Sequence, residues 1–157
     1  MAKEQPAPGE HESVARNKRA RHDYELLDRW EAGIVLVGSE VKSLRAGKAN
    51  LQDAYGILRD GQVYLLNCHI APYDHAGYIN HDPTRTRKLL LHKAEIRRLI
   101  GAVERKGLTL VPLELYFKRG LAKVSIALGR GKKEHDKRDD ERKRDAEREI
   151  ARAVSRR

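Results

Sequence analysis

Seven histidines and one cysteine are the side chains that most readily suggest metal or acid–base chemistry. His69, His75 and His81 are evenly spaced, but Cys68 is the one thiol in the chain. Their spacing matches neither the paired cysteines of structural zinc sites nor the HExxH helix of zinc proteases. We therefore expect no metal, no cofactor and no catalytic residue, and we interpret these histidines as ordinary polar or RNA-facing side chains.

Motifs for phosphate loops and nucleophiles do not support an enzyme either. Residues 129–133 are glycine-rich and basic, but they lack the length and the Ser or Thr of a P-loop. The sequence contains no GxSxG nucleophile motif and no GxGxxG after a strand. A ribonuclease would need paired carboxylates around a metal or a histidine acid–base pair, and no compelling set is present. An enzyme is therefore the weaker hypothesis.

Basic side chains gather in three clusters, which suits the phosphates of a nucleic acid. The clusters lie in residues 17–22, at three-residue spacing in residues 42–48, and shortly after Asp82-Pro83. Arginine offers a planar fork that binds phosphate bidentately, and lysine offers a mobile charge. The alternative is a set of solvated faces, but three clusters on one small domain favour RNA contact. The members are Asn17, Lys18, Arg19, Arg21, His22, Lys42, Arg45, Lys48, Arg85, Arg87 and Lys88.

The overall charge agrees with a polyanionic partner. The 157 residues include 33 Lys and Arg against 23 Asp and Glu, which gives a net charge of +10. Such a charge could serve solubility alone, but its clustering favours nucleic acid. A single cysteine excludes an intrachain disulfide, no stretch approaches the roughly 20 apolar residues of a membrane span, and residues 1–13 lack the apolar core of a signal peptide. We expect a cytoplasmic protein with no membrane partner.

Composition divides the chain into three zones. Residues 1–15 are polar and contain two prolines and a glycine, so we expect an extension that is disordered. Residues 16–129 carry nearly all the core-forming side chains and make up the predicted RNA-binding domain. Residues 130–157 hold 12 basic and 8 acidic residues with no aromatic ring, and they form a charged C-terminal tail.

The middle zone is typical of strands separated by turns. Asp60-Gly61 lies between two apolar runs and predicts a hairpin with a type I′ turn, because that turn needs positive φ at both central residues. Pro112 predicts a sheet edge or a bulge, since proline cannot donate to a strand ladder. Lys118-Arg119-Gly120 predicts another turn. The predicted strands lie within residues 33–37, 57–66, 88–92, 108–117 and 121–128.

One helix is clear and two are short. Residues 93–106 place apolar side chains at helical spacing, and Gly107 is a suitable left-handed cap. Shorter helices are predicted at residues 18–24 and at residues 39–45, the latter with Ser39 as N-cap. Antiparallel strands with about three short helices predict a mainly β fold in a closed or nearly closed barrel. Periodicity alone does not separate an OB-type barrel from other small β folds.

The tail contains acid-before-base pairs at i, i+4 spacing. They are Glu134 with Arg138, Asp139 with Lys143 and Asp140 with Arg144. Each pair stabilises a helix by about 0.2–0.5 kcal/mol, and a lone helix of this length is marginal in water. We therefore expect a tail that is disordered when free and helical along a partner. Its apolar stripe is too short for an ordinary coiled coil.

Several stretches together resemble a known family. They are residues 17–24 (NKRARHDY), 31–35 (EAGIV), 39–50 (SEVKSLRAGKAN), 80–93 (NHDPTRTRKLLLHK), 110–113 (LVPL) with 115–116 (LY), and 131–138 (GKKEHDKR). In this order and at this length they resemble the SsrA-binding protein family, also called small protein B, the bacterial partner of transfer-messenger RNA. The resemblance covers about residues 16–157.

The resemblance implies a fold, two partners and a set of site residues. It implies an OB-type barrel that binds the tRNA-like domain of transfer-messenger RNA and delivers it to ribosomes stalled without a usable codon. The family's RNA-binding residues map onto Asn17, Glu31 and Leu91, and a matching stretch ends at Asn50. The family's tail enters the empty messenger channel and the decoding region of the ribosome. The matching tail residues here are Gly131, Lys132, Lys133, His135, Asp136, Lys137 and Arg138.

Some alternatives stay open at this point. A general ribosomal or single-strand RNA protein with an OB fold is disfavoured, because such proteins stack bases on rings and this chain has one Phe, one Trp and six Tyr. Glu31 could accept hydrogen bonds from a base or ribose, or orient an arginine. Leu91 could contact a base or hold its loop, and both residues could simply serve the fold. We expect a monomer when the protein is free.

Overall fold

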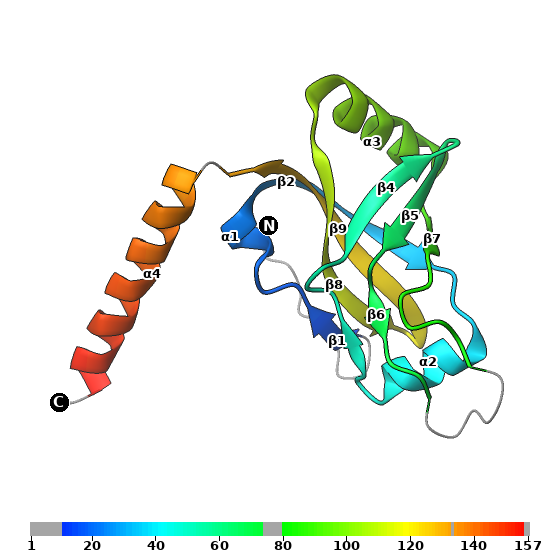
Figure 1. The fold of residues 1–157 in the computed structure, drawn as a ribbon, viewed down its shortest axis with the longest axis horizontal. Helices are drawn as coiled ribbons and strands as arrows, with labels where there is room; N and C mark the ends of the chain where they lie inside the picture. The colour runs from blue at the N-terminus through cyan, green and yellow to red at the C-terminus, as the bar shows by residue number, and fades with distance from the viewer. Residues whose placement is uncertain (1–10, 74–79, 133, 156–157) are drawn as a thin grey trace.

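Figure 1 shows the fold of the protein in a computed structural model, which describes residues 11–73, 80–132 and 134–155. Strands form most of the body. They are β1 (His11–Arg16), β2 (Tyr24–Ile34), β3 (Ala49–Asn50), β4 (Tyr55–Arg59), β5 (Gln62–Leu66), β6 (His69–Ile70), β7 (Arg87–Leu90), β8 (Thr109–Lys118) and β9 (Leu121–Gly131). The helices are α1 (Ala20–Asp23), α2 (Gly38–Arg45), α3 (Lys93–Lys106) and α4 (Glu134–Ser155).

Strand β8 connects three parts of the sheet. It pairs with β1, β4 and β9, and all three pairings are antiparallel. From β4 the pairing continues through β5, β7 and β2 to β9, which returns to β8, so the strands curve around one core (Figure 1). Strands β3 and β6 form a separate two-stranded sheet. The predicted mainly β, antiparallel fold is confirmed.

The turns follow the sequence signals. Asp60 and Gly61 have φ of 51° and 71° and connect β4 to β5, so the predicted type I′ hairpin is confirmed. Arg119 and Gly120 have φ of 51° and 79° between β8 and β9. Helix α3 begins and ends where predicted, with Gly107 left-handed at its C-cap.

The predicted irregularity at Pro112 is a bulge. The register of β8 against β9 shifts between Pro112 and Glu114, and Leu113 has no partner across the ladder. Proline has no N–H to donate, so the ladder is interrupted at the place where a donor is missing. The carbonyls of Pro112 and Leu113 at this bulge both accept hydrogen bonds from Asn17.

The core fills the space inside the curved sheet. Leu65, Leu89 and Leu115 from the strands are fully buried, as are Leu44 of α2 and Leu99 of α3. Burying such an aliphatic side chain stabilises the fold by about 1.5–3 kcal/mol. Single buried leucines therefore help to hold the short helices against the sheet.

Three boundaries differ from the sequence predictions. Residues 11–15, expected to be disordered, belong to strand β1, because β8 offers its free edge to them and half-buries Val14 and Ala15. Strand β2 begins at Tyr24 and ends at Ile34, so the predicted strand at 33–37 overlaps only its last residues. Helix α2 has Val37 as its N-cap instead of Ser39.

Two expectations, no disulfide and no membrane span, concern the cysteine and the helices. Cys68 is fully buried, and burial raises the pKa of its thiol to about 11, so the thiol is unreactive at neutral pH. In the described part of the chain, the helices are too short or too polar to cross a bilayer.

Candidate nucleic-acid interface

The bulge in β8 fixes the position of Asn17. The backbone N–H of Asn17 donates to the carbonyl of Leu113 at 2.8 Å, and its side-chain Nδ2 donates to the carbonyl of Pro112 at 3.0 Å. These bonds hold Asn17 between the end of β1 and the start of α1. The bond to Pro112 uses one of the two N–H donors of the Asn17 side chain. The second N–H and the amide oxygen could still bond to a ligand.

A hollow beside Asn17 brings the first basic cluster together. Lys18 and Arg21 line it with Arg16 and Arg29, and Ser125 of β9 closes one side. A second hollow, which shares Arg16 and Lys18 with the first, joins Lys18 and Arg19 to Asn50 of β3. The two hollows bring together four predicted residues of the first cluster and Asn50, and they add Arg16 and Arg29, which the sequence did not indicate. His22 lines neither hollow.

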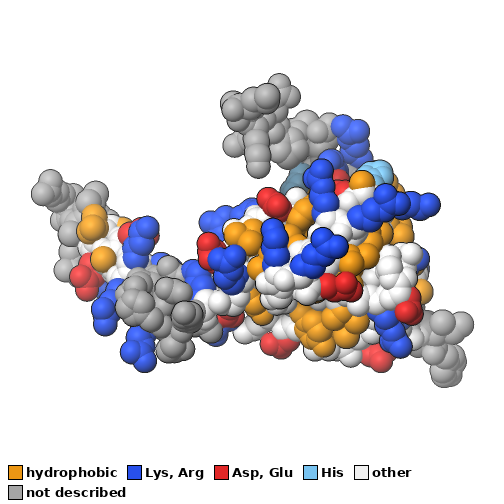
Figure 2. All heavy atoms as spheres, turned by 90° about the horizontal axis from the view of Figure 1, so that it is seen from above, with side chains coloured by type: hydrophobic (Ala, Val, Ile, Leu, Met, Phe, Trp, Pro, Cys, Tyr) orange, Lys and Arg blue, Asp and Glu red, His pale blue; other side chains and the backbone are white. Residues whose placement is uncertain are grey.

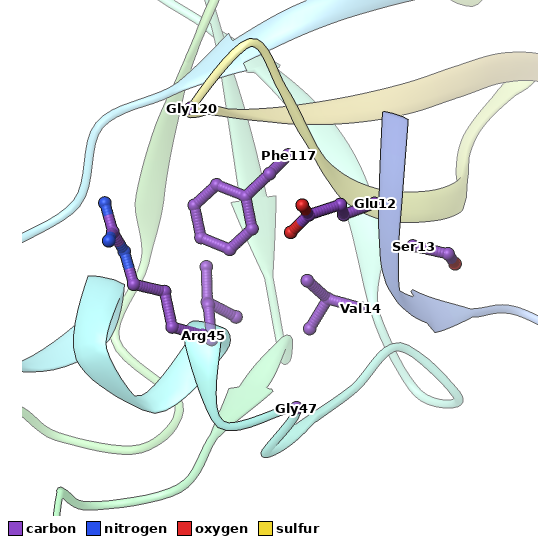
Figure 3. Close-up of a pocket in the computed structure, with 8 residues that line it drawn as sticks. Glu12, Ser13, Val14, Arg45, Gly47, Phe117 and Gly120 are labelled. Atoms are coloured by element: carbon purple, nitrogen blue, oxygen red, sulfur yellow. The ribbon is translucent and has the colours of Figure 1, made fainter. Parts of the chain in front are cut away.

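The second basic cluster lies on and just after α2, and Arg45 faces β1 across a hollow. Figure 3 shows the hollow in which Arg45 lies near Phe117, opposite Val14 and Glu12 of β1. The Arg45 guanidinium carbon is 5.9 Å from the centre of the Phe117 ring. Val14 lines this hollow and the one that contains Asn50, so the two are neighbours along β1. Lys42 is exposed, with its Nζ 5.5 Å from the Tyr73 ring, and Lys48 is exposed after α2.

The third basic cluster is at least half-buried throughout, and two of its three members bind Glu40. Arg87 is fully buried, donates to Glu40 at 2.5 Å and also donates to the carbonyls of Cys68 and Pro83. Arg85 donates to Glu40 at 2.6 Å and to the carbonyl of Val35 at 3.2 Å. The interpretation of Arg87 as an RNA-binding residue is therefore wrong in this fold, because its charge is neutralised inside the core. Lys88 is half-buried on β7.

Glu40 is the acidic centre of this buried network. Its side chain is fully buried, and burial alone would raise its pKa. Hydrogen bonds from Arg85, the Val37 N–H and Arg87 outweigh that effect and hold the pKa of Glu40 below its usual value. The network ties α2 to β7 and to the segment before it.

Glu31 is positioned by side chains from β8. The Tyr116 hydroxyl donates to Glu31 Oε2 at 2.5 Å, and Lys118 Nζ lies 3.3 Å from Oε1. Burial acts to raise the pKa of Glu31, but the bonds from Tyr116 and Lys118 hold it below its usual value. Burial and the adjacent Glu31 carboxylate raise the pKa of Tyr116 well above its usual range. Glu31 thus stays charged while its carboxylate remains partly open to solvent.

Tyr116 belongs to a polar row that crosses from β1 to β2. The His11 ring stacks on it with centroids 4.3 Å apart, and His11 Nε2 lies 2.9 Å from Glu114, which also accepts from Arg16 at 3.0 Å. Glu31 and Glu114 both pair across strands with Ser125, which lines the Asn17 hollow. Asn17 and Glu31 therefore share one sheet surface. Their contacts with β8 join residues about 90 positions apart, for which the sequence has no local signal.

Leu91 lies apart from this row. It is half-buried against the core between β7 and α3, while its neighbour Leu90 exposes 52% of its surface. Leu90 packs across from Gly33 of β2, two residues from Glu31. Leu90 is therefore more exposed than Leu91, and the selection of Leu91 as an RNA-binding residue stays a prediction.

The tail begins later than predicted. Arg130 and Gly131 belong to β9, and Lys132 is half-buried, with its N–H donating to Asp23 and its Nζ to the carbonyl of Arg21. Lys133 and the side chains of His135, Asp136 and Lys137 lie outside the described residues, and Arg138 is exposed on α4. The helix that the acid–base spacing predicts is present as α4, and its dependence on a partner stays a prediction.

His22 connects the first cluster to α4. Its Nδ1 lies 3.0 Å from Asp23, and its Nε2 lies 2.8 Å from Glu141. The ring is therefore engaged within the chain at both nitrogens. The selection of His22 as an RNA-binding residue stays a prediction. To bind RNA, its ring would have to give up its contact with Asp23 or with Glu141.

Comparisons with known proteins assign this chain to a family. The family model of the SmpB protein matches residues 14–156. The chain belongs to the SmpB family. An SsrA-binding protein of Trichormus variabilis is 61% identical over 142 residues, covering 90% of this chain and 92% of the relative. Another, from Symbiobacterium thermophilum, is 58% identical over 149 residues and covers 94% of both chains.

A solved structure supports the same assignment. One of its chains superposes on this member of the SmpB family with a TM-score of 0.64 at 60% identity, covering 76% of this chain and 84% of that one. The structure is described as "tmRNA-SmpB: a journey to the center of the bacterial ribosome". At this identity the likeness concerns the sequence as well as the fold.

The buried network predicts opposite outcomes for two neighbouring cations. Arg87→Ala removes the fully buried partner of Glu40 and leaves the half-buried Arg85 as its remaining ion-pair partner. Breaking a buried ion pair costs about 3–5 kcal/mol. Lys88→Ala, the matched control, changes the free energy of unfolding by less than about 1 kcal/mol. Urea unfolding of both variants measures the difference. Equal stabilities would contradict the structural role of Arg87.

The same network predicts acid sensitivity. Because the folded-state pKa of Glu40 is lowered, its stabilisation is complete above the unfolded-state pKa and is lost as the pH falls through the folded-state value. In Arg87→Ala this part of the pH dependence shrinks, since the main buried partner is gone. A pH series of the same urea titrations measures it.

Tyr116→Phe tests the positioning of Glu31. Removing one hydroxyl donor raises the pKa of Glu31 toward its ordinary value, because a hydrogen bond to the charged form is lost. An NMR titration of the Glu31 carboxyl carbon measures this pKa. Tyr64→Phe on β5 is the control and leaves it unchanged. An unaltered Glu31 pKa in Tyr116→Phe would show that Lys118 alone sets it.

Proposed function

We propose that this protein is a non-catalytic adaptor that binds the tRNA-like domain of transfer-messenger RNA and brings that RNA to stalled bacterial ribosomes. The observation that carries the proposal is membership of the SmpB family, whose relatives are named SsrA-binding proteins. The described structural neighbour joins tmRNA and SmpB on the bacterial ribosome. The partners proposed for this chain are therefore transfer-messenger RNA and the ribosome, in the cytoplasm.

The body of the protein supplies the RNA-docking surface in this proposal. The strand pairings that return to β8 support an OB-type barrel, with three helices in the body. The hollows along β1 combine cations for phosphates with Asn17 and Asn50 for hydrogen bonds. Such a mixture suits a folded RNA, in which phosphates set position and exposed base or ribose edges add selectivity.

Glu31 has a role in this surface despite its charge. A carboxylate repels phosphate but accepts hydrogen bonds from base amino groups or ribose hydroxyls. The Tyr116 and Lys118 contacts fix the carboxylate while leaving it partly exposed, which supports that role over repulsion. Leu90 or Leu91 would then offer apolar contact beside it.

The tail acts on the ribosome in this proposal. The tail beyond Lys132 would be disordered or fraying in the free protein and would form a helix along ribosomal RNA in the empty messenger channel and the decoding region. The surface of α4 supports this, because exposed Arg138, Arg142 and Arg144 can release counterions from RNA. The cost of ordering the tail would be offset by those contacts.

The experiment that tests this division of labour removes the tail. The last strand predicted from the sequence ends at Leu128, but β9 continues to Gly131, so a cut after Leu128 would break this strand. The chain should instead end after Lys132, whose contacts to α1 then remain. We expect the truncated protein to bind the tRNA-like domain within about threefold of the full chain, a change below 1 kcal/mol. We also expect it to lose peptide tagging on stalled ribosomes.

Two outcomes would refute the proposal. Full tagging activity of the truncated protein would show that the tail is not needed on the ribosome. Equal affinity of the full chain for the tRNA-like domain and for an unrelated hairpin RNA would leave a general RNA-binding protein in place of a dedicated adaptor.

A further inference from the structure

Helix α3 exposes a basic face that the proposed docking surface does not use. Ile96 and Leu99 are buried against the core, whereas Lys93, Arg97, Arg98 and Arg105 are exposed. At about 100° per residue these four cations lie within one arc of roughly 140°. We name this set the α3 ridge.

The centre of the α3 ridge is flat. Ala94 and Gly101 lie between the cations on the helical projection, and a Cβ added to Gly101 would meet nothing within 4 Å. A nucleic-acid duplex can therefore approach the helix backbone while arginines reach the duplex from both sides. Arg97 and Arg105 are separated by about 12 Å along the axis, a length over which a duplex presents several phosphates.

The other charges on α3 offset only part of the ridge. Exposed Glu104 lies within the same arc, so the ridge carries four cations against one anion. Glu95 accepts a hydrogen bond from the His92 N–H at 3.0 Å and so caps the start of the helix. Within the described parts of the chain, no acidic side chain forms an ion pair with Arg97, Arg98 or Arg105. Interaction with the helix dipole explains a cation in the last turn, such as Arg105, but not Arg97 and Arg98 in the middle.

The α3 ridge is remote from the first docking surface. Figure 1 shows α3 at one end of the curved sheet, with α2 and β1 near the opposite end. Figure 2, seen from the side of α3, shows Lys and Arg side chains gathered on this face next to hydrophobic ones. The two basic surfaces therefore point in different directions.

We propose that the α3 ridge binds the phosphate backbone of a second RNA segment while the β1 surface holds the first. This inference rests on the proposed function, because it takes the tRNA-like domain as the first RNA and places the second on the ribosome. Contact is by charge and shape along a duplex, which requires no base-specific side chain.

Charge reversal of two central arginines tests the proposal. Arg97→Glu with Arg98→Glu changes the net charge by −4, and Arg59→Glu with Arg130→Glu is a control with the same change at exposed positions elsewhere. We expect both variants to bind the isolated tRNA-like domain within about threefold of the unaltered chain.

The readout is binding of the protein–RNA complex to ribosomes stalled on a truncated message. We expect the α3 variant to weaken this binding about tenfold or more and to lower its salt slope by roughly 2, since about 0.7–0.9 is lost for each phosphate contact. The control should stay within about threefold.

Four outcomes would overturn the proposal. They are unchanged ribosome binding of the α3 variant, an equal loss in the control, a loss confined to the isolated tRNA-like domain, and a photo-crosslink from position 94 that reaches ribosomal protein instead of RNA. Tagging by the unaltered chain, measured in parallel, reports on the proposed function separately.

Discussion

The three pairings of strand β8 are the constraint on which the candidate site depends. Because β8 contacts β1, β4 and β9, it holds the edge strand, the hairpin and the long C-terminal strand in one frame. Its bulge at Pro112 leaves carbonyls that bind Asn17, and its Tyr116 and Lys118 hold Glu31. Strand β8 therefore holds both Asn17 and Glu31.

The cations of this protein serve different physical purposes. Arg85 and Arg87 neutralise buried Glu40 and stabilise the fold, although their sequence context looks the same as that of a phosphate-binding cluster. Arg16 pairs with Glu114, while Lys18 and Arg21 line open hollows. A net charge of +10 therefore overstates the number of cations that are free to meet RNA.

The sequence predicted those features that are determined by residues close together in the chain. The Asp60-Gly61 turn, the Pro112 bulge and helix α3 follow from backbone requirements of one to fourteen residues. The sequence did not reveal β1 or the burial of Arg87, because both depend on partners far along the chain. The Tyr116 contact with Glu31 spans 85 positions. Family resemblance selected Asn17 and Glu31, and local periodicity could not explain why they lie together.

We propose that the surface around Asn17 docks the tRNA-like domain, and the affinity of Asn17→Ala for this RNA tests the proposal most directly. Asn17→Ala keeps the backbone bond to Leu113 but removes the side-chain bond to Pro112. With folding verified by circular dichroism and Gln62→Ala as control, we expect the Kd for this RNA to rise about tenfold in Asn17→Ala, or about 1.4 kcal/mol. A folded Asn17→Ala protein with an unchanged Kd would contradict it.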